Sequence, residues 1–137
     1  MGTTIRPELS EKNKYYIEKH RYYELKHFCL QYPIWKKAYI SLDSLSKRPS
    51  DLALFKRSEE SPVERCVLAR DYYKTRMEMV ENICRETDLI MSDYILHGVT
   101  EGCSYEILKA RFSIPCCKDY YYSLYRRFFW LLSKARE

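Results

Sequence analysis

Apolar side chains recur every three or four residues along most of the chain, which is the spacing of one face of an α-helix. The clearest run has intervals of four, three, four and three and consists of Cys117, Tyr121, Leu124, Phe128 and Leu131. Similar spacing occurs over residues 13–31, 34–45, 62–86 and 89–97. The pattern therefore predicts an all-α fold.

Helix boundary signals support this interpretation. Ser61 is a typical N-cap, Pro62 suits the first helical position, and Glu64 completes a capping box, so a long central helix is expected to begin there. Thr87 or Asp88 can cap the next helix, and Gly98 is the expected stop of that helix.

The same signals predict the domain organisation. Residues 1–12 are polar and are expected to form a flexible N-terminus. Residues 13–86 are expected to form an N-terminal helical hairpin, interrupted at Pro33, and the long central helix, which together serve association or partner binding. Residues 47–60 lack a helical period and are expected to connect the two parts of this module. Residues 87–137 are expected to form a C-terminal helix-turn-helix module.

The helix-turn-helix is predicted from the order of elements near the C-terminus. Ser104 can cap a short helix with Ile107 and Leu108 on its inner side. Residues 113–115 allow only a tight turn, in which Ile114 is expected to fill the core between the two helices. A long final helix follows. Together with the preceding helix, which is expected to end at Gly98, these make three consecutive helices with a short middle member. This is the layout of a helix-turn-helix.

The outer face of the final helix is the candidate DNA-binding surface. Opposite its apolar seam lie Lys118, Asp119, Tyr122, Tyr125 and Arg126, with Arg127 at the edge. Arg126 can pair with guanine or phosphate and Lys118 with phosphate, while Tyr122 or Tyr125 can pack on sugar or thymine methyl groups. Lys109 and Arg111, on the preceding helix, can hold the flanking backbone. The alternative is a face that is solvated or contacts protein.

Charge is distributed unevenly along the chain. The net charge of +5 comprises +1 for residues 1–20, +5 for residues 21–57, −5 for residues 58–102 and +4 for residues 103–137. The basic C-terminal part favours a polyanionic partner. The acidic middle is expected to be either a partner surface or a self-pairing face for the basic hairpin.

Other chemistry finds little support in the sequence. The six cysteines contain no CxxC pair, and only three glycines occur, without a nucleotide-binding or hydrolase motif. We therefore expect no catalytic residue, no metal site, no cofactor and no enzymatic activity.

The polar N-terminus and the lack of a long apolar run predict a cytoplasmic protein without a membrane partner. The adjacent Cys116 and Cys117, at a helix start, are either small hydrophobes or a redox switch with lowered thiol pKa.

A family resemblance points the same way. The segments YYELKHFCLQYPIWKKAY, SPVER and IPCCKDYYYSLYRRFFWLLSK together resemble small phage-encoded regulators of Gram-positive bacteria related to the ArpU and RinA late-gene activators. The resemblance covers residues 22–134 and implies a helix-turn-helix like that of sigma-factor region 4, which controls transcription of phage late or packaging genes. It assigns residues 116–127 to the recognition helix and residues 104–111 to its support. The sequence departs from the family where small polar residues usually open the recognition helix.

The sequence thus favours a phage or prophage transcriptional regulator that docks on duplex DNA and uses its N-terminal module for self-association or for contacting RNA polymerase. Two alternatives stay open. One is a phage protein-interaction module that binds and inhibits a host or defence protein, for which Trp130 beside Phe129 offers an aromatic anchor. The other is a DNA-packaging adaptor that assembles into a ring.

Overall fold

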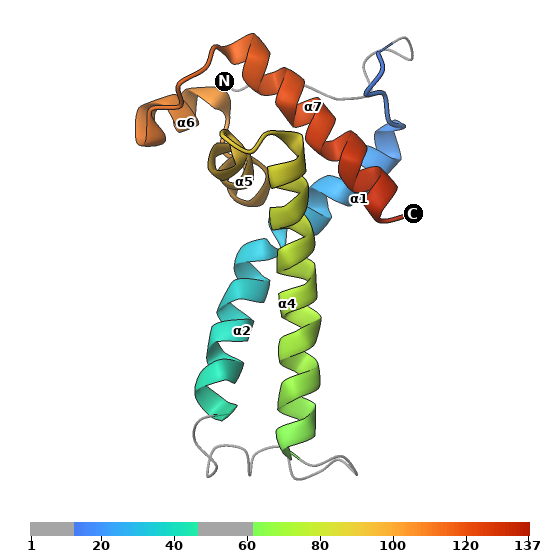
Figure 1. The fold of residues 1–137 in the computed structure, drawn as a ribbon, viewed down its shortest axis with the longest axis vertical. Helices are drawn as coiled ribbons and strands as arrows, with labels where there is room; N and C mark the ends of the chain where they lie inside the picture. Colours follow the sequence, from blue (N-terminus) through green and yellow to red (C-terminus); the bar gives the residue numbers. More distant parts are fainter. Residues whose placement is uncertain (1–12, 47–61) are drawn as a thin grey trace. The chain divides into compact units, whose positions relative to one another are not determined.

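The computed structural model describes residues 13–46 and 62–137, and these residues form helices without any strand (Figure 1). The predicted all-α fold is confirmed. The predicted N-terminal tail, the predicted connecting segment and the Ser61 cap lie outside the described residues. Among the described helices, none combines the length and the hydropathy that a bilayer-spanning segment needs.

The chain divides into two compact units, one made of Met1–Gln31 with Val80–Glu137 and the other of Tyr32–Met79. This division differs from the expected one, which separates residues 13–86 from residues 87–137. Helices α1 (Lys19–Leu30) and α2 (Tyr32–Ser46), expected to pair as a hairpin, fall into different units. Helix α1 instead packs against α5 (Ser92–Glu101) and α7 (Lys118–Ala135).

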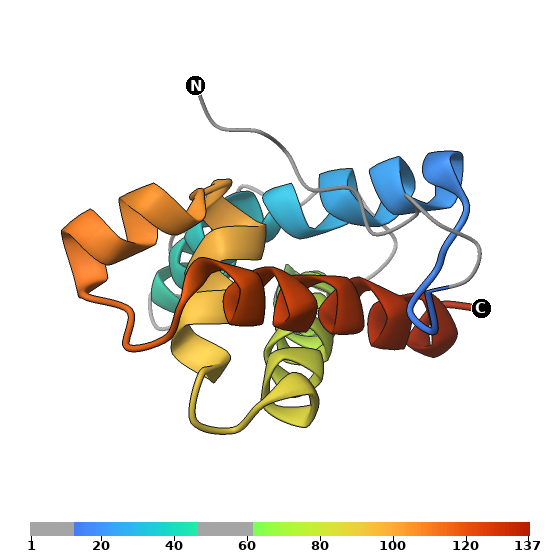
Figure 2. The same cartoon turned by 90° about the horizontal axis from the view of Figure 1, so that it is seen from above.

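Helix α1 begins later than the apolar spacing predicts. Glu18 is its N-cap, because the Glu18 carboxylate accepts hydrogen bonds from the backbone N–H groups of His20 (3.0 Å) and Arg21 (3.2 Å). Tyr22 and the later residues of the predicted stripe, Leu25 and Cys29, are buried as expected. Figure 2 shows this helix lying alongside α7, so the stripe is covered by the C-terminal helix.

Helix α4 (Pro62–Thr87) begins at the proline that the capping signal indicates. In the second unit it lies beside α2: Cys66 Sγ donates to the Leu42 carbonyl at 3.3 Å, and Arg70 donates to the Tyr39 hydroxyl at 3.3 Å. The predicted seam continues into the first unit, where its last two members, Val80 and Cys84, are fully buried. Helix α4 therefore contributes core residues to both units.

The connection from α4 to α5 is held by Asp88, one of the two predicted caps. The Asp88 carboxylate accepts from the N–H groups of Ile90 (3.0 Å) and Met91 (3.1 Å). The predicted stop at Gly98 is wrong, because α5 continues to Glu101 and ends at Gly102, whose φ of 71° is the left-handed cap conformation. Gly98 lies inside α5, where a β-carbon would collide with the Tyr121 hydroxyl. This glycine allows the close approach of α5 and α7.

An aromatic cluster fills the space between α1 and α7. The hydroxyls of Tyr22 and Tyr125 form a buried hydrogen bond at 2.7 Å, and the Tyr22 ring meets the Phe129 ring edge to face at a centroid distance of 5.1 Å. Burial, with the neighbouring Tyr22 hydroxyl, raises the pKa of Tyr125, so the Tyr125 hydroxyl stays protonated at neutral pH. The hydrogen bond lies among buried aromatic rings.

We expect Tyr22→Phe to lower the free energy of unfolding by about 1–2 kcal/mol, since it leaves the Tyr125 hydroxyl buried without its partner. Urea denaturation measures this change. Adding Tyr125→Phe should cost much less than a second independent loss, because the pair is then removed together. Tyr121→Phe is the matched control, because among the described residues the buried Tyr121 hydroxyl has no hydrogen-bond partner. Equal losses for Tyr22→Phe and Tyr121→Phe would show that the bond contributes nothing.

Candidate nucleic-acid interface

Helix α6 (Tyr105–Phe112) and the turn after it position the start of α7. The predicted cap is confirmed, because the Ser104 hydroxyl accepts from the Ile107 N–H at 3.4 Å. The helix ends at Ser113, which adopts a left-handed conformation (φ 52°) and donates its N–H to the Lys109 carbonyl at 3.2 Å. Ile114 is buried, as expected for the residue that fills the core beneath the turn.

Tyr105 joins α6 to the beginning of α7. Its hydroxyl donates to the Cys116 carbonyl at 2.6 Å, and its backbone N–H donates to the Tyr122 hydroxyl at 3.2 Å. Sequence reasoning missed this residue, although its intervals of three to Leu108 and seven to Phe112 are those of an inner helix face. Ile107, predicted to point inward, is 43% exposed instead. The turn is thus fixed on both sides by one buried tyrosine.

An ion pair connects the first turns of the two helices. Lys118 Nζ lies 2.9 Å from Glu106 Oε1, and both side chains are exposed. The hydrogen bond from Lys118 lowers the pKa of Glu106, and the same bond raises the pKa of Lys118, so both remain charged at neutral pH. Asp119, also predicted for this surface, is exposed in the same first turn. The carboxylates of Glu106 and Asp119 therefore lie on the same surface as Lys118, the side chain expected to contact phosphate.

Tyr122 and Tyr125 do not belong to the outer face, contrary to the prediction. They are only 6% and 9% exposed, because the start of α6 packs on Tyr122 and α1 packs on Tyr125. Tyr122 holds the start of α6 and Tyr125 is bonded to Tyr22, so neither is available to DNA in this structure. At the same time Cys117, expected in the core, is exposed.

The exposed tyrosine of this region is Tyr120, which sequence reasoning missed. It is 47% exposed, and its hydroxyl donates to the Asp88 carboxylate at 2.9 Å. This bond to Asp88 raises the pKa of Tyr120. The contact places the connection between α4 and α5 beside the first turn of α7.

The remaining predicted cations keep access to solvent. Lys109 and Arg111 are exposed on α6, and Arg126 and Arg127 are partly exposed on α7. Arg126 lies eight residues after Lys118 in the same helix, which corresponds to about 12 Å along its axis. The cations therefore border the α6 surface and the first half of α7 without any close cluster.

The Cys116 thiol at the start of α7 does not have the lowered pKa that a redox switch would use. Partial burial, with the neighbouring Cys117 thiol, raises the pKa of Cys116. Cys117 is the N-cap of α7, and its side chain makes no capping hydrogen bond. The raised pKa of Cys116 favours the first of the two alternatives, a small hydrophobic side chain, over a redox switch.

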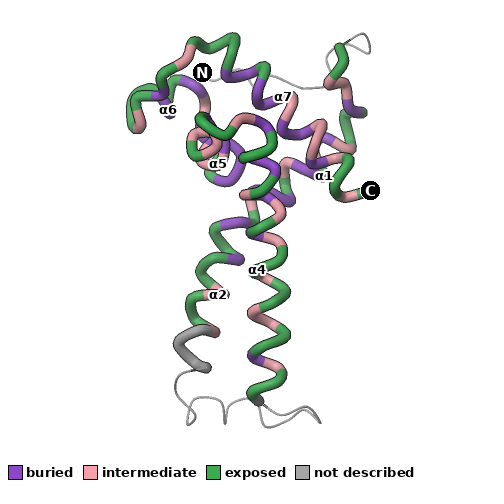
Figure 3. Tube along the Cα trace, in the orientation of Figure 1, coloured by how far each residue is buried: buried purple, intermediate pink, exposed green. Residues whose placement is uncertain are grey.

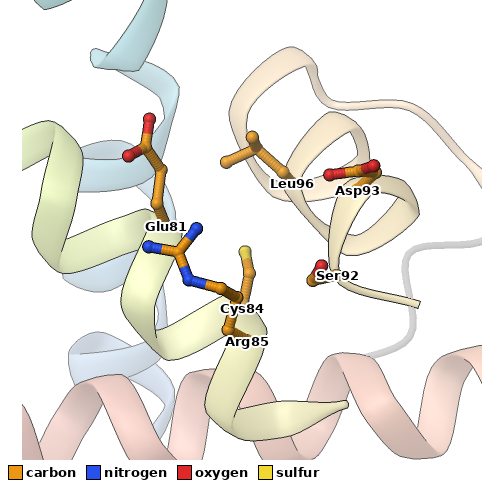
Figure 4. Close-up of a pocket in the computed structure, with 6 residues that line it drawn as sticks. All are labelled: Glu81, Cys84, Arg85, Ser92, Asp93 and Leu96. Carbon is orange, nitrogen blue, oxygen red and sulfur yellow. The ribbon is translucent and has the colours of Figure 1, made fainter. Parts of the chain in front are cut away.

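A pocket lies between the last turns of α4 and the first turns of α5 (Figure 4). It is lined by Glu81, Cys84, Arg85, Ser92, Asp93 and Leu96. Burial raises the pKa of the Cys84 thiol to about 12, so this group is protonated at neutral pH and is a poor nucleophile. Over the part of the chain that the structure describes, no three His, Cys, Asp or Glu side chains gather as a metal site.

Comparison with known proteins returned no match among protein-family models, curated proteins or solved structures.

Proposed function

We propose that this chain is a phage or prophage DNA-binding transcriptional regulator that places the first half of α7 against duplex DNA. The proposal includes the relationship to the ArpU and RinA late-gene activators. The observation that carries it is the α6-turn-α7 unit, in which a capped short helix, a tight turn and a buried tyrosine hold an exposed helix start. This is the arrangement in which helix-turn-helix proteins present a recognition helix.

Exposure and charge support the same surface. Lys118 and Ser123 face solvent on the first half of α7, and Lys109 and Arg111 do so on α6. The free backbone N–H groups and the positive end of the helix dipole lie at the first turn of α7, where they stabilise a bound phosphate most strongly. Residues 103–137 carry a net charge of +4, so the module as a whole attracts a polyanion.

The test is fluorescence anisotropy of a labelled random-sequence duplex titrated with the protein at several salt concentrations. We expect log K to fall linearly with log salt concentration, as counterions leave the DNA. Lys118→Ala with Arg126→Ala should make this line shallower, reducing the magnitude of its slope by about 2, since each phosphate contact contributes about 1. Glu106→Gln should increase affinity, because it removes a negative charge from the same surface and releases Lys118 from its ion pair.

Lys134→Ala is the matched control for the single variant Lys118→Ala, because each removes one positive charge and Lys134 lies at the far end of α7, 16 residues beyond Lys118. Its affinity should stay close to that of the wild type. A folded sample without affinity at low salt contradicts the proposal. So does an equal loss in the Lys118 and Lys134 variants, which would indicate attraction by net charge alone.

A second candidate function, binding to a host protein such as RNA polymerase, is favoured by the connection between α4 and α5. Leu89 is 73% and Ile90 85% exposed, while Asp88 fixes the backbone that carries them. Rigidly held apolar side chains in solvent are typical of a protein contact. If this candidate is right, Leu89→Ser with Ile90→Ser abolishes a stoichiometric complex with purified polymerase and leaves DNA affinity unchanged.

A further inference from the structure

One side of the second half of α7 stays in contact with solvent. Arg127, Trp130 and Lys134 lie on this side, because intervals of three and four residues place side chains on one face of a helix. Arg127 and Trp130 are half-buried and Lys134 is exposed, whereas Phe128 and Phe129 are buried on other sides of the helix. Figure 3 shows half-buried and exposed positions recurring along α7 between the buried ones. This side of α7 is therefore open to a partner.

A second aromatic ring reaches this side of α7 from the segment before α1. The ring centroids of Tyr15 and Trp130 are 5.4 Å apart, and the ring planes are inclined at 57°. Asn13 fixes the segment, because its side-chain Oδ1 accepts from the Tyr15 N–H at 2.8 Å and its backbone carbonyl accepts from the Tyr16 N–H at 3.0 Å. Figure 2 shows this segment beside the last turns of α7. Two half-buried rings thus share one surface.

Cations border both rings. Lys134 Nζ lies 3.8 Å from the Trp130 ring centroid, and Lys14 Nζ lies 4.9 Å from the Tyr15 ring centroid. Arg127 lies one helical turn before Trp130. Within residues 13–46 and 62–137, neither these lysines nor Arg127 takes part in an ion pair. We call these five residues the Trp130 surface, and its charge favours an anionic partner.

Rings and cations in this arrangement match single-stranded nucleic acid. Unpaired bases stack on aromatic side chains, while lysine and arginine beside the rings contact the phosphates. Duplex DNA keeps its bases stacked inside the helix and offers no free base to the rings. An acidic peptide offers carboxylates to the cations but no series of flat rings. The combination of two rings with unpaired cations therefore favours a single strand over both.

We propose that the Trp130 surface binds single-stranded nucleic acid, with a base stacked on Trp130 and phosphates held by Lys14, Arg127 and Lys134. Lys134 covers the Trp130 ring in the free protein. Its side chain is exposed and has a flexible four-carbon stem, so its ammonium moves to a phosphate when a base takes the ring face. The Trp130 surface is separate from the Lys118 surface proposed for duplex DNA, so each proposal can fail without the other.

The experiment is a titration of the full chain with a short oligothymidylate at low salt, followed by tryptophan fluorescence, which a stacked base quenches. Trp35 is only 4% exposed and lies in the other unit, so quenching reports on Trp130. An abasic strand of the same length carries the same phosphates without bases. It should bind at least about fivefold more weakly and leave the fluorescence unchanged, because it cannot stack. The tighter ligand of oligothymidylate and oligouridylate then identifies DNA or RNA as the source of the strand.

Trp130→Ala should weaken oligothymidylate binding at least about fivefold, and Trp130→Phe should restore most of the affinity, because a ring is present again. Anisotropy of a labelled strand measures these affinities, and circular dichroism establishes that each variant is folded. Tyr72→Ala is the matched control, because Tyr72 is another exposed ring with a cation, Arg76, 3.5 Å from its centroid, and it lies in the other unit. Its affinity should equal that of the wild type.

Two lysine variants separate this proposal from duplex docking. Lys134→Ala should reduce the magnitude of the salt slope for oligothymidylate by about 0.7, the contribution of one phosphate contact on a single strand. Lys118→Ala should leave oligothymidylate binding unchanged and weaken duplex binding alone. Absence of oligothymidylate binding, equal affinity for the abasic strand, equal losses in Trp130→Ala and Tyr72→Ala, or tighter binding of an oligoglutamate of the same charge would each overturn the proposal.

Discussion

Phe129→Ala is expected to lower the free energy of unfolding by about 3–5 kcal/mol, the range for removing a fully buried phenylalanine ring. Phe129 is 0% exposed. Its ring lies at centroid distances of 5.1 Å from Tyr22, 4.9 Å from Tyr125 and 5.0 Å from Phe128. The substitution therefore leaves a cavity between α1 and α7. Urea denaturation with linear extrapolation measures the loss.

Ser123→Ala is the control for Phe129→Ala, because Ser123 is exposed on the same helix. It should change stability by no more than about 0.5 kcal/mol. A loss below about 1 kcal/mol for Phe129→Ala would mean that the ring is not enclosed. The packing of α1 over α7, and with it the burial of Tyr125, would then be incorrect.

Gly98→Val is expected to cost about 3 kcal/mol or more, because the new side chain enters space that a neighbouring ring already fills. A β-carbon at residue 98 would collide with the Tyr121 hydroxyl, and Tyr121 is itself only 1% exposed. The ring cannot turn away without displacing the cluster around it, so α5 and α7 must separate. Thermal unfolding and urea denaturation both report this change.

Ala110→Val is the control for Gly98→Val, since it introduces the same β-branched side chain at an exposed position of α6. It should cost well under 1 kcal/mol, which is the helix-propensity difference. If the two variants lose stability equally, the close approach of α5 to α7 does not exist. Gly98 would then be an ordinary helical residue.

The sequence predicted those parts of the fold that depend on local signals. Pro62 starts α4, Ser104 caps α6 and Ile114 is buried, because caps and turns are decided by a few neighbouring residues. The failure at Gly98 has a non-local cause: a glycine inside a helix looks like a stop until the tyrosine that packs on it is known. No local pattern indicates that approach.

The candidate site was predicted only in part, for a similar reason. The prediction rested on one apolar stripe of α7 and placed the rest of the helix surface in solvent. In the structure, a second side of this helix, which includes Tyr122, Tyr125 and Phe129, is also buried. The second cover, α1, comes from about a hundred residues earlier in the chain. Charged side chains such as Lys118 were placed outside correctly, because charge resists burial in any fold. Tyrosine has no such preference, so Tyr122 and Tyr125 were misplaced and Tyr120 was overlooked.

The measurement that tests DNA docking by α7 most directly is a ¹H–¹⁵N NMR titration of the full chain with a short random-sequence duplex at low salt. The account predicts that amide shifts concentrate on α6 and the first half of α7, around Lys109, Lys118 and Ser123, while amides near Lys36 on α2 stay in place. Shifts confined to α2 and α4, or an unchanged spectrum, would contradict it.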